Sequence, residues 1–450
     1  MESALTRLDE WYTRCLTRVK QYETVRIHGR VQSVNGILVH TRLPNAKIGD
    51  LCRIERSDNS PLLAEIIGFN RNDALLSVLG GLEGVSLWNQ VEPLGYPHSV
   101  HVNDDLLGQV LDGFGRPLGA DTGGAFVDGS VESASTVIGN AEVPSKRPSI
   151  CQPIETGVRA LDGLVTLGKG QRVALFAGPG CGKTTLISEI ARNADCDVIV
   201  FGMVGERGRE LRQFIDHELD EELRQRAVIV CSTSDCSSME RSRAAFTATA
   251  IAESYRQRGM HVLLLIDSLT RYVRAQREIG LAAGEPMGRG GLPPSVYGML
   301  PRLLERAGLS EKGAITAIYT VLIEQDSMND PVADEVRSLV DGHVVLSRKL
   351  AEQGHYPAID ILSSLSRVQN DITGIEHRRA ATEFRRLMSA YNDVEIMLRL
   401  GEYQPGADPI VDRAVAAREA MLGFLRQELR EPVPSAETLK YLQELTHYAA

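Results

Sequence analysis

A run of small residues ending in lysine and threonine has the composition and spacing of a site that binds phosphate groups. Glycine lets the backbone bend and bring its N–H groups close to phosphate oxygens, because no Cβ stands in the way. The ammonium of Lys183 can reach the β- and γ-phosphates, and the Thr184 hydroxyl can ligate Mg²⁺. The run consists of Ala177, Gly178, Pro179, Gly180, Cys181, Gly182, Lys183, Thr184 and Thr185. It predicts a nucleotide site, and the alternative is a glycine-rich turn without a ligand.

A carboxylate follows a second apolar run. Residues Val262 to Ile266 are all aliphatic, and Asp267 comes directly after them. In an α/β sheet the working residues lie just beyond the carboxyl ends of the strands. We therefore expect Asp267 beside the phosphate loop, where it would hold Mg²⁺ through water. The alternative role for Asp267 is to cap the helix that follows.

A third polar group, Gly205 to Glu210, comes after the apolar run Val198 to Val204. A carboxylate at that edge of the sheet can accept the proton of an attacking water, so Glu206 is the predicted general base. Arg207 is expected to touch the phosphates, to fix Glu206, or to be a solvated charge. Residues Glu324 to Asp326 follow a further strand and have a weaker claim to the same edge.

These side chains require a sheet that brings the ends of several strands together. Aliphatic runs between residues 150 and 370 have the near-continuous hydrophobicity of strands that are buried on both faces of a parallel sheet. These runs are Arg172–Phe176, Val198–Met203, Val228–Cys231, Val262–Ile266 and Ile315–Leu322. The predicted fold class is therefore α/β.

The rest of the chain is expected to form separate parts. Helical periodicity broken by prolines predicts a C-terminal helical domain over residues 375–450, which leaves residues 99–374 for the nucleotide-binding domain. Residues 1–24 have apolar side chains at helical spacing opposite a charged face, so they predict an amphipathic arm that docks on a partner protein or an anionic membrane, or packs on its own domain. Residues 25–98 predict a small N-terminal β-barrel from short runs between turns: Val25–Ile27, Ile37–His40, Leu51–Ile54, Leu62–Phe69 and Ala74–Val78.

Composition narrows the class of protein. The chain has 49 Lys and Arg against 59 Asp and Glu, a net charge of −10, which argues against a protein that coats nucleic acid. No apolar run approaches the roughly 20 residues that a bilayer crossing needs, and no secretory signal is visible, so we expect a cytoplasmic chain. Because the 7 cysteines are scattered without a C-x-x-C pair, we expect buried, reduced thiols and no structural metal.

Several segments together resemble a known superfamily. From about residue 25 to the end, the chain is similar to the catalytic subunits of rotary ATP synthases and, within that superfamily, to the type III secretion system ATPases. The flagellar export ATPases are the next most similar group. The resemblance is carried by Leu106–Pro117, Gly205–Glu210, Asp267–Arg271, Pro293–Arg306 and Tyr356–Asp360.

The resemblance implies a fold and roles for residues. It implies a RecA-like P-loop ATPase domain between an N-terminal β-barrel and a C-terminal helical domain, in a homohexameric ring with nucleotide between subunits. The loop Gly178 to Thr185 would bind ATP, and Lys183 and Thr184 would bind phosphate and Mg²⁺. Glu206 would be the general base, and Asp267 the second carboxylate of the metal site.

The resemblance also assigns roles that spacing alone does not reveal. Arg207 and Arg271 would lie near the γ-phosphate. The segment Ser364 to Val368 would supply Arg367 as an arginine finger to the neighbouring subunit. The tyrosine that stacks on adenine in the synthase catalytic subunit would fall on Leu292, so this chain would lack it.

Partners follow from the same resemblance. They would be a stator protein at the N-terminal arm, a coiled-coil central stalk in the ring pore and chaperone–effector complexes at the C-terminal domain, with peripheral association at the inner membrane. ATP would be used to release effectors from chaperones, unfold them and drive their export. The rival interpretations are a flagellar export ATPase, a hexameric nucleic-acid motor, a subunit of a rotary synthase and a module that binds ATP only structurally.

Overall fold

The computed structural model describes residues 11–13, 15, 28–58, 60–119, 125–127, 129, 134–323 and 330–448. The chain divides into two compact units, Met1–Pro97 and His98–Ala450. Apart from residues 11–13 and 15, the predicted arm lies outside the described residues. The predicted strand Val25–Ile27 and the polar group Glu324 to Asp326 also lie outside them.

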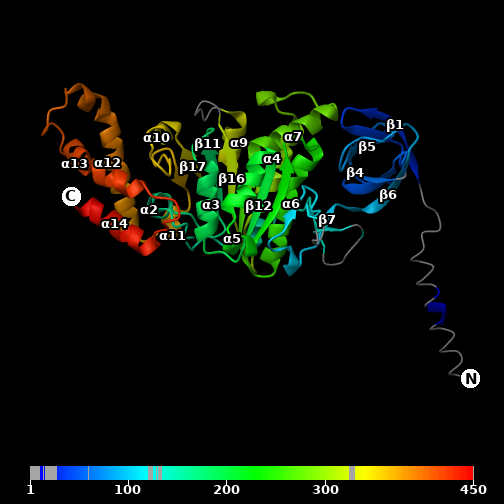
Figure 1. Cartoon of the computed structure of the whole chain (residues 1–450), viewed down its shortest axis with the longest axis horizontal. Coiled ribbons are helices and arrows are strands. Elements are labelled where there is room, and N and C mark those ends of the chain that lie inside the picture. The colour runs from blue at the N-terminus through cyan, green and yellow to red at the C-terminus, as the bar shows by residue number, and fades with distance from the viewer. Residues whose placement is uncertain are drawn as a thin grey trace, which may run out of the picture. The chain divides into compact units, whose positions relative to one another are not determined.

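The described part of the first unit is a closed antiparallel barrel, which confirms the predicted β-barrel (Figure 1). Its interior is aliphatic, with Val31, Ile54 and Leu76 fully buried. Two of its strands were not predicted, because polar residues interrupt the first and a glycine and two prolines interrupt the last. Around the barrel the strands are β1 (Gly29–Asn35), β2 (Leu38–Thr41), β5 (Asp73–Val78), β4 (Pro61–Asn70), β3 (Asp50–Glu55) and β6 (Gln90–Pro97).

The described part of the second unit is built on a nine-stranded sheet, which confirms the α/β class. Its strands run parallel except β15 and β18, which pair antiparallel with β16 and β17. The order is β18 (Leu365–Ser366), β17 (Gly342–Leu346), β11 (Arg172–Ala177), β16 (Ala314–Leu322), β14 (His261–Asp267), β12 (Val198–Glu206), β13 (Ala227–Thr233) and β8 (Val110–Leu111), with β15 (Gly308–Leu309) beside β16. A small separate sheet contains β10 (Ser135–Thr136), β7 (Ser99–Val100) and β9 (Phe126–Val127).

Helices cover both faces of the nine-stranded sheet, because successive strand residues point to opposite faces. All residues of β12 and β14 are buried. One face packs on α6 (Ser238–Gln257), α7 (Leu269–Ala282) and α8 (Pro294–Leu304). The other face packs on α3 (Lys183–Asn193), α4 (Gly208–Gln213) and α5 (Glu221–Gln225). This burial on both faces explains why the central strands could be found from hydrophobicity alone.

The end of the chain is helical, as predicted. Helices α12 (Ile375–Leu400), α13 (Pro409–Leu425) and α14 (Ser435–Tyr448) lie together in Figure 1. The short helix α2 (Arg159–Leu164) packs among them, since Leu161 and Leu164 share a buried cluster with Phe424. His377 Nε2 also lies 2.7 Å from the carbonyl oxygen of Gly163.

Two further expectations concern membrane crossing and the cysteine thiols. No helix in the described part of the chain combines the length and apolar character that a membrane crossing requires. All seven cysteines are free. Cys52, Cys181 and Cys231 are buried as expected, but Cys151 is exposed, so the expectation of uniformly buried thiols is wrong there.

Candidate active site

The phosphate loop connects the end of β11 to the start of α3. Gly180 has a φ of +79° and Gly182 a φ of +82°, in the left-handed region that side chains other than glycine rarely adopt. Gly182 is the residue immediately before α3, and no side chain caps that end of the helix. The first N–H groups of α3 therefore face the loop without partners within the helix, which suits an anion.

Three charged side chains converge at this edge of the sheet. Glu206 is the last residue of β12 and Asp267 is the last residue of the adjacent strand β14. The Nζ atom of Lys183 contacts Oδ1 of Asp267 and lies 4.0 Å from Oε1 of Glu206. Thr320 on β16 donates a hydrogen bond of 2.7 Å to Oδ1 of Asp267. The structure thus brings together the lysine and both carboxylates that the sequence singled out.

Glu206 has the burial and the acidity that a general base needs at neutral pH. Glu206 is only 5% exposed. Burial raises the pKa of Glu206 to about 7, and the nearby charge of Asp267 acts in the same direction, while Lys183 and Arg271 partly oppose the shift. The Oε1 atom has no hydrogen-bond partner among the described residues. A carboxylate with such a pKa is poised to accept a proton near pH 7.

The two arginines predicted near the γ-phosphate occupy different environments. Arg271 on α7 forms a 3.0 Å ion pair with Oε2 of Glu206 and also donates to the carbonyl oxygen of Gly205. Arg207, in contrast, has a side chain that is 76% exposed and pairs with Glu210 at 3.3 Å. Arg271 therefore orients the carboxylate, whereas Arg207 forms no ion pair with it in the described part of the chain.

Arg367 lies at the other end of the strands. Ser366, the residue before it, pairs with Gly342 at the start of β17, and Gly342 pairs with Val173 near the start of β11. The phosphate loop follows the opposite end of β11. Arg367 is exposed, and its Nη2 donates a 3.2 Å hydrogen bond to the carbonyl oxygen of Arg337 on α9 (Pro331–Leu339). It is thus separated from the phosphate loop of its own chain.

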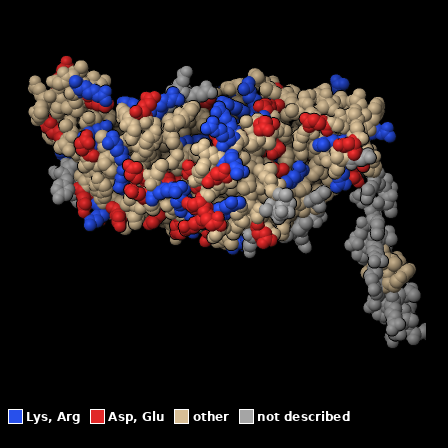
Figure 2. Space-filling model, viewed as in Figure 1, with Lys and Arg blue, Asp and Glu red and all other residues tan. Residues whose placement is uncertain are grey.

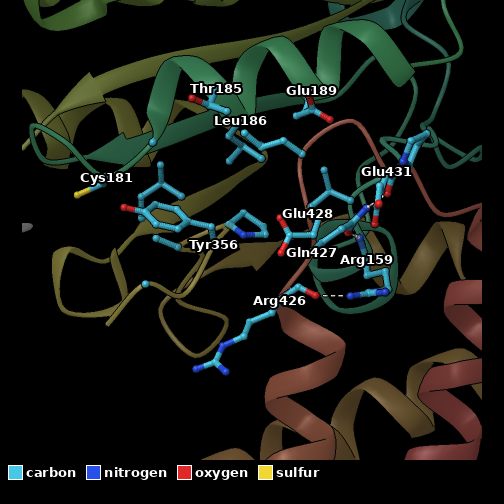
Figure 3. Close-up of a pocket in the computed structure, with 18 of the residues that line it drawn as sticks. Arg159, Cys181, Thr185, Leu186, Glu189, Tyr356, Arg426, Gln427, Glu428 and Glu431 are labelled. Carbon is cyan, nitrogen blue, oxygen red and sulfur yellow. Dashed lines mark hydrogen bonds between the residues drawn. The ribbon is translucent and has the colours of Figure 1, made fainter. Parts of the chain in front are cut away.

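A cavity of about 700 Å³ adjoins the phosphate loop (Figure 3). Thr185 and Leu186 of α3 line it together with Tyr356. In Figure 3, Gln427 and Glu428 from the connection after α13 lie on the side of Tyr356 away from Cys181. Tyr356 is 44% exposed, and its ring lies 3.6 Å from where a Cβ would stand on Gly182. A flat aromatic ring beside a phosphate loop suits stacking against a nucleobase.

Tyr356, and not Leu292, is the side chain that lies beside the phosphate loop. Leu292 is only 7% exposed, belongs to the buried cluster beneath α7 and α8, and does not line this cavity. Leu292 therefore lies outside the cavity beside the phosphate loop. The segment Tyr356 to Asp360 belongs to the family resemblance. Because it is far from the phosphate loop in the sequence, no local pattern indicated that Tyr356 would line this cavity.

The residues present fit a nucleotide with Mg²⁺. Thr184 and Asp267 offer the hard oxygen atoms that Mg²⁺ prefers, and Mg²⁺ usually takes its remaining ligands from substrate phosphates and water. Such a site needs few protein carboxylates. A cluster of three or more His, Cys, Asp or Glu able to hold a metal is not found among the described residues.

Comparisons with known proteins identify the family. The pattern of the ATP synthase alpha/beta family matches residues 25–95 as its beta-barrel domain and residues 157–366 as its nucleotide-binding domain. Residues 373–444 match the C-terminal domain of the type III secretion ATPase EscN. A type 3 secretion system ATPase of Pseudomonas syringae pathovar tomato is 62% identical over 441 residues, which cover 98% of both chains.

The chain belongs to the type III secretion system ATPase family.

Other relatives agree with this assignment. The SPI-2 type 3 secretion system ATPase of Salmonella typhimurium is 49% identical over 90% of this chain and 91% of its own. The flagellum-specific ATP synthase of Bacillus subtilis is 41% identical over 95% of this chain and 97% of its own. The assembled ATPase EscN of enteropathogenic E. coli has a similar structure, with a TM-score of 0.87 at 43% identity, and the match covers 93% of this chain and all of that one. The chain is an ATPase of this family.

Proposed function

We propose that the chain hydrolyses Mg-ATP at the site formed by Lys183, Glu206 and Asp267, and that the energy drives protein export through a type III secretion system. The observation that carries the proposal is the position of Glu206. One of its oxygens is held by Arg271 and the other has no hydrogen-bond partner among the described residues. A buried carboxylate arranged in this way beside a phosphate loop is suited to activate water.

Each residue of the site has a distinct task. Lys183 and the backbone N–H groups of the loop hold the phosphates, and Thr184 and Asp267 hold Mg²⁺. Bound Mg²⁺ neutralises charge on the β- and γ-phosphate oxygens. Glu206 accepts the proton of the attacking water through Oε1, while Arg271 fixes the other oxygen of the carboxylate.

The cavity beside the loop takes the base. Tyr356 stacks on one face of adenine, and the connection that contains Gln427 closes the opposite side. The backbone N–H of Gln427 donates a 3.0 Å hydrogen bond to the carbonyl oxygen of Tyr356, so this connection and the tyrosine are tied together. The connection between α13 and α14 thus contributes directly to the nucleotide site.

The active unit is a homohexamer in which Arg367 serves the site of the neighbouring subunit. Two observations support this: Arg367 lies at the opposite end of the strands from its own loop, and EscN has been solved as an assembled ATPase. An arginine that reaches the γ-phosphate from a neighbour offsets transition-state charge and contributes about 10³ to 10⁵ in rate.

The same assignment suggests partners and a location. EscN has also been solved with its central stalk EscO, which supports a coiled-coil stalk for this chain. We further propose that a stator protein binds the arm of residues 1–24 and that chaperone–effector complexes bind residues 375–450. The chain would act in the cytoplasm, at the inner membrane. On the face shown in Figure 2, acidic and basic side chains are interspersed, and this distribution with a net charge of −10 argues against a nucleic-acid motor.

Two substitutions separate binding from chemistry. Lys183→Ala should abolish binding of a fluorescent ATP analogue. Glu206→Gln should still bind the analogue but release no phosphate, because an amide can hold water but cannot take its proton. The matched control is Asp216→Asn, a surface carboxylate that pairs with Arg212 and should leave turnover unchanged. Normal turnover by Glu206→Gln would refute the assignment of the base.

Mixing experiments test the shared site. Arg367→Ala should bind ATP and assemble but hydrolyse little. Mixed with Glu206→Gln, it should regain activity at interfaces that combine an intact base with an intact finger. Specific activity should also rise with protein concentration until rings form. Full turnover by Arg367→Ala, or constant specific activity down to clearly monomeric protein, contradicts the shared site.

A further inference from the structure

A bidentate ion pair joins Arg172, the first residue of β11, to Asp341, the residue before β17. Nε of Arg172 donates to Oδ2 of Asp341 at 3.0 Å, and Nη2 donates to Oδ1 at 2.9 Å. The backbone N–H of Arg172 donates to the same carboxylate at 3.0 Å. A guanidinium that meets a carboxylate through two parallel hydrogen bonds fixes the relative orientation of both groups.

Asp341 in turn holds the segment that carries Arg367. The backbone N–H of Arg367 donates a 2.9 Å hydrogen bond to the carbonyl oxygen of Asp341. Nε2 of Gln171 donates to that carbonyl oxygen and to Oγ of Ser366, each at 3.1 Å. Gln171 therefore binds Ser366, the residue before Arg367, and Arg172 and Gln171 both bind Asp341, which accepts the backbone N–H of Arg367.

The ion pair is sheltered enough to hold its geometry. The side chain of Arg172 is 15% exposed and that of Asp341 is 26% exposed. Burial lowers the pKa of Arg172, but the hydrogen bonds and charges of Asp341 and Glu305 outweigh this effect and raise it. Arg172 thus stays charged and remains paired with the carboxylate of Asp341.

We propose that Arg172 and Asp341 are positioning residues that hold Arg367 in place for the neighbouring subunit. This inference rests on the proposed role of Arg367 as a finger in trans. Strand β11 spans only six residues, from Arg172 to the residue before the phosphate loop. One strand therefore separates the phosphate loop of a subunit from the ion pair to which the segment of Arg367 is bonded.

Asp341→Asn tests the proposal because it keeps the shape of the side chain but removes its charge. A finger displaced by about 1 Å should lower kcat by roughly ten- to a hundredfold. The dissociation constant for a fluorescent ATP analogue should stay unchanged, because the phosphate loop is intact. Arg172→Lys, which keeps the charge but loses the two-pronged geometry, should give the same result and decides the matter if Asp341→Asn does not fold.

Glu305→Gln is the matched control. Glu305 also pairs with Arg172, at 2.6 Å from Nη1, but it belongs to the segment that follows α8 and forms no hydrogen bond or ion pair with Asp341 or Arg367 among the described residues. Its substitution should leave kcat within about twofold of wild type, as expected of a surface-exposed partner. A loss in Glu305→Gln equal to that in Asp341→Asn overturns the positioning role, because the effect would then follow from any change at Arg172.

A second readout separates positioning from general damage. In the Arg367→Ala background, Asp341→Asn should cause no further loss of kcat, because the group it positions is already absent. Mixed rings of Asp341→Asn and Glu206→Gln should regain activity, since the latter supplies a well-placed finger. Additive losses, or no recovery on mixing, overturn the inference and leave the shared site standing. Full turnover by Arg367→Ala instead overturns the shared site itself.

Discussion

The Nζ atom of Lys183 lies 4.0 Å from Oε1 of Glu206, and that oxygen accepts no hydrogen bond from the described residues. The other oxygen of Glu206 is held by Arg271 at 3.0 Å. The carboxylate is therefore divided between two tasks. One oxygen fixes its orientation, and the other remains available for a proton within reach of the group that binds phosphate.

The pH dependence of turnover should report Glu206. Its pKa is raised to about 7, so below that pH the folded enzyme carries a protonated carboxyl that cannot act as a base, and kcat/KM should rise as the pH increases through about 7. Arg271→Ala should move the midpoint to higher pH, because Arg271 lowers the pKa of Glu206. Arg212→Ala, an exposed arginine, should leave the midpoint in place. A pH–rate profile that is flat across neutral pH contradicts this prediction.

Tyr356→Ala should weaken nucleotide binding by about 1–3 kcal/mol, the usual contribution of a ring stacked on a base, with little change in kcat. Tyr356→Phe should retain the affinity. Leu292→Ala serves as the contrasting variant: it should lower the free energy of unfolding by about 2–5 kcal/mol without an equal loss of affinity. Titration with a fluorescent ATP analogue and urea unfolding measure the two effects. Loss of affinity in Leu292→Ala but not in Tyr356→Ala would reverse our assignment.

The central strands and the phosphate loop could be predicted because each signal is local. A strand buried on both faces is continuously apolar, and the loop is one contiguous run. Strands β17 and β18 were not predicted. They are short, and β17 contains a histidine and begins with a glycine, so neither shows a strong apolar pattern.

Side chains far apart along the chain were harder to predict. Asp267 and Glu206 could be placed because both follow buried strands whose ends meet at one edge. Tyr356 and Arg367 lie in segments whose own pattern is unremarkable, and their positions depend on tertiary packing. Arg367 was found only through family resemblance. Leu292, onto which the stacking tyrosine was aligned, is buried and does not line the cavity, and no local pattern indicated this.

Glu253→Ala should destabilise the protein by about 3–5 kcal/mol, because it leaves a buried guanidinium without its partner. Arg306 is fully buried, and its Nε donates to Oε1 of Glu253 at 3.0 Å. Urea unfolding measures the loss. The surface pair offers the control, since Asp216→Asn should change stability by less than about 0.5 kcal/mol. Equal stability of Glu253→Ala and wild type would show that water or another group compensates Arg306.

Deleting residues 1–24 should leave an ATPase with normal turnover that no longer associates with membranes or with a stator protein. The reason is the apolar stripe that includes Leu5, Leu8 and Trp11. Replacing these three residues by serine in the full chain should have the same effect as the deletion. Vesicle flotation measures membrane association. A truncated chain that aggregates or melts early would place the arm in the folded core instead.

Helix α2 precedes the phosphate loop in sequence but packs among the C-terminal helices. Arg385 on α12 donates a 2.9 Å hydrogen bond to the carbonyl oxygen of Leu164, and Gly163 lies so close to Phe424 that a Cβ there would stand 2.9 Å from its ring. These helices are therefore not a module that recombination could exchange at a single crossover. A chimera that inherits its C-terminal helices from a relative must inherit α2 from the same parent to keep this packing.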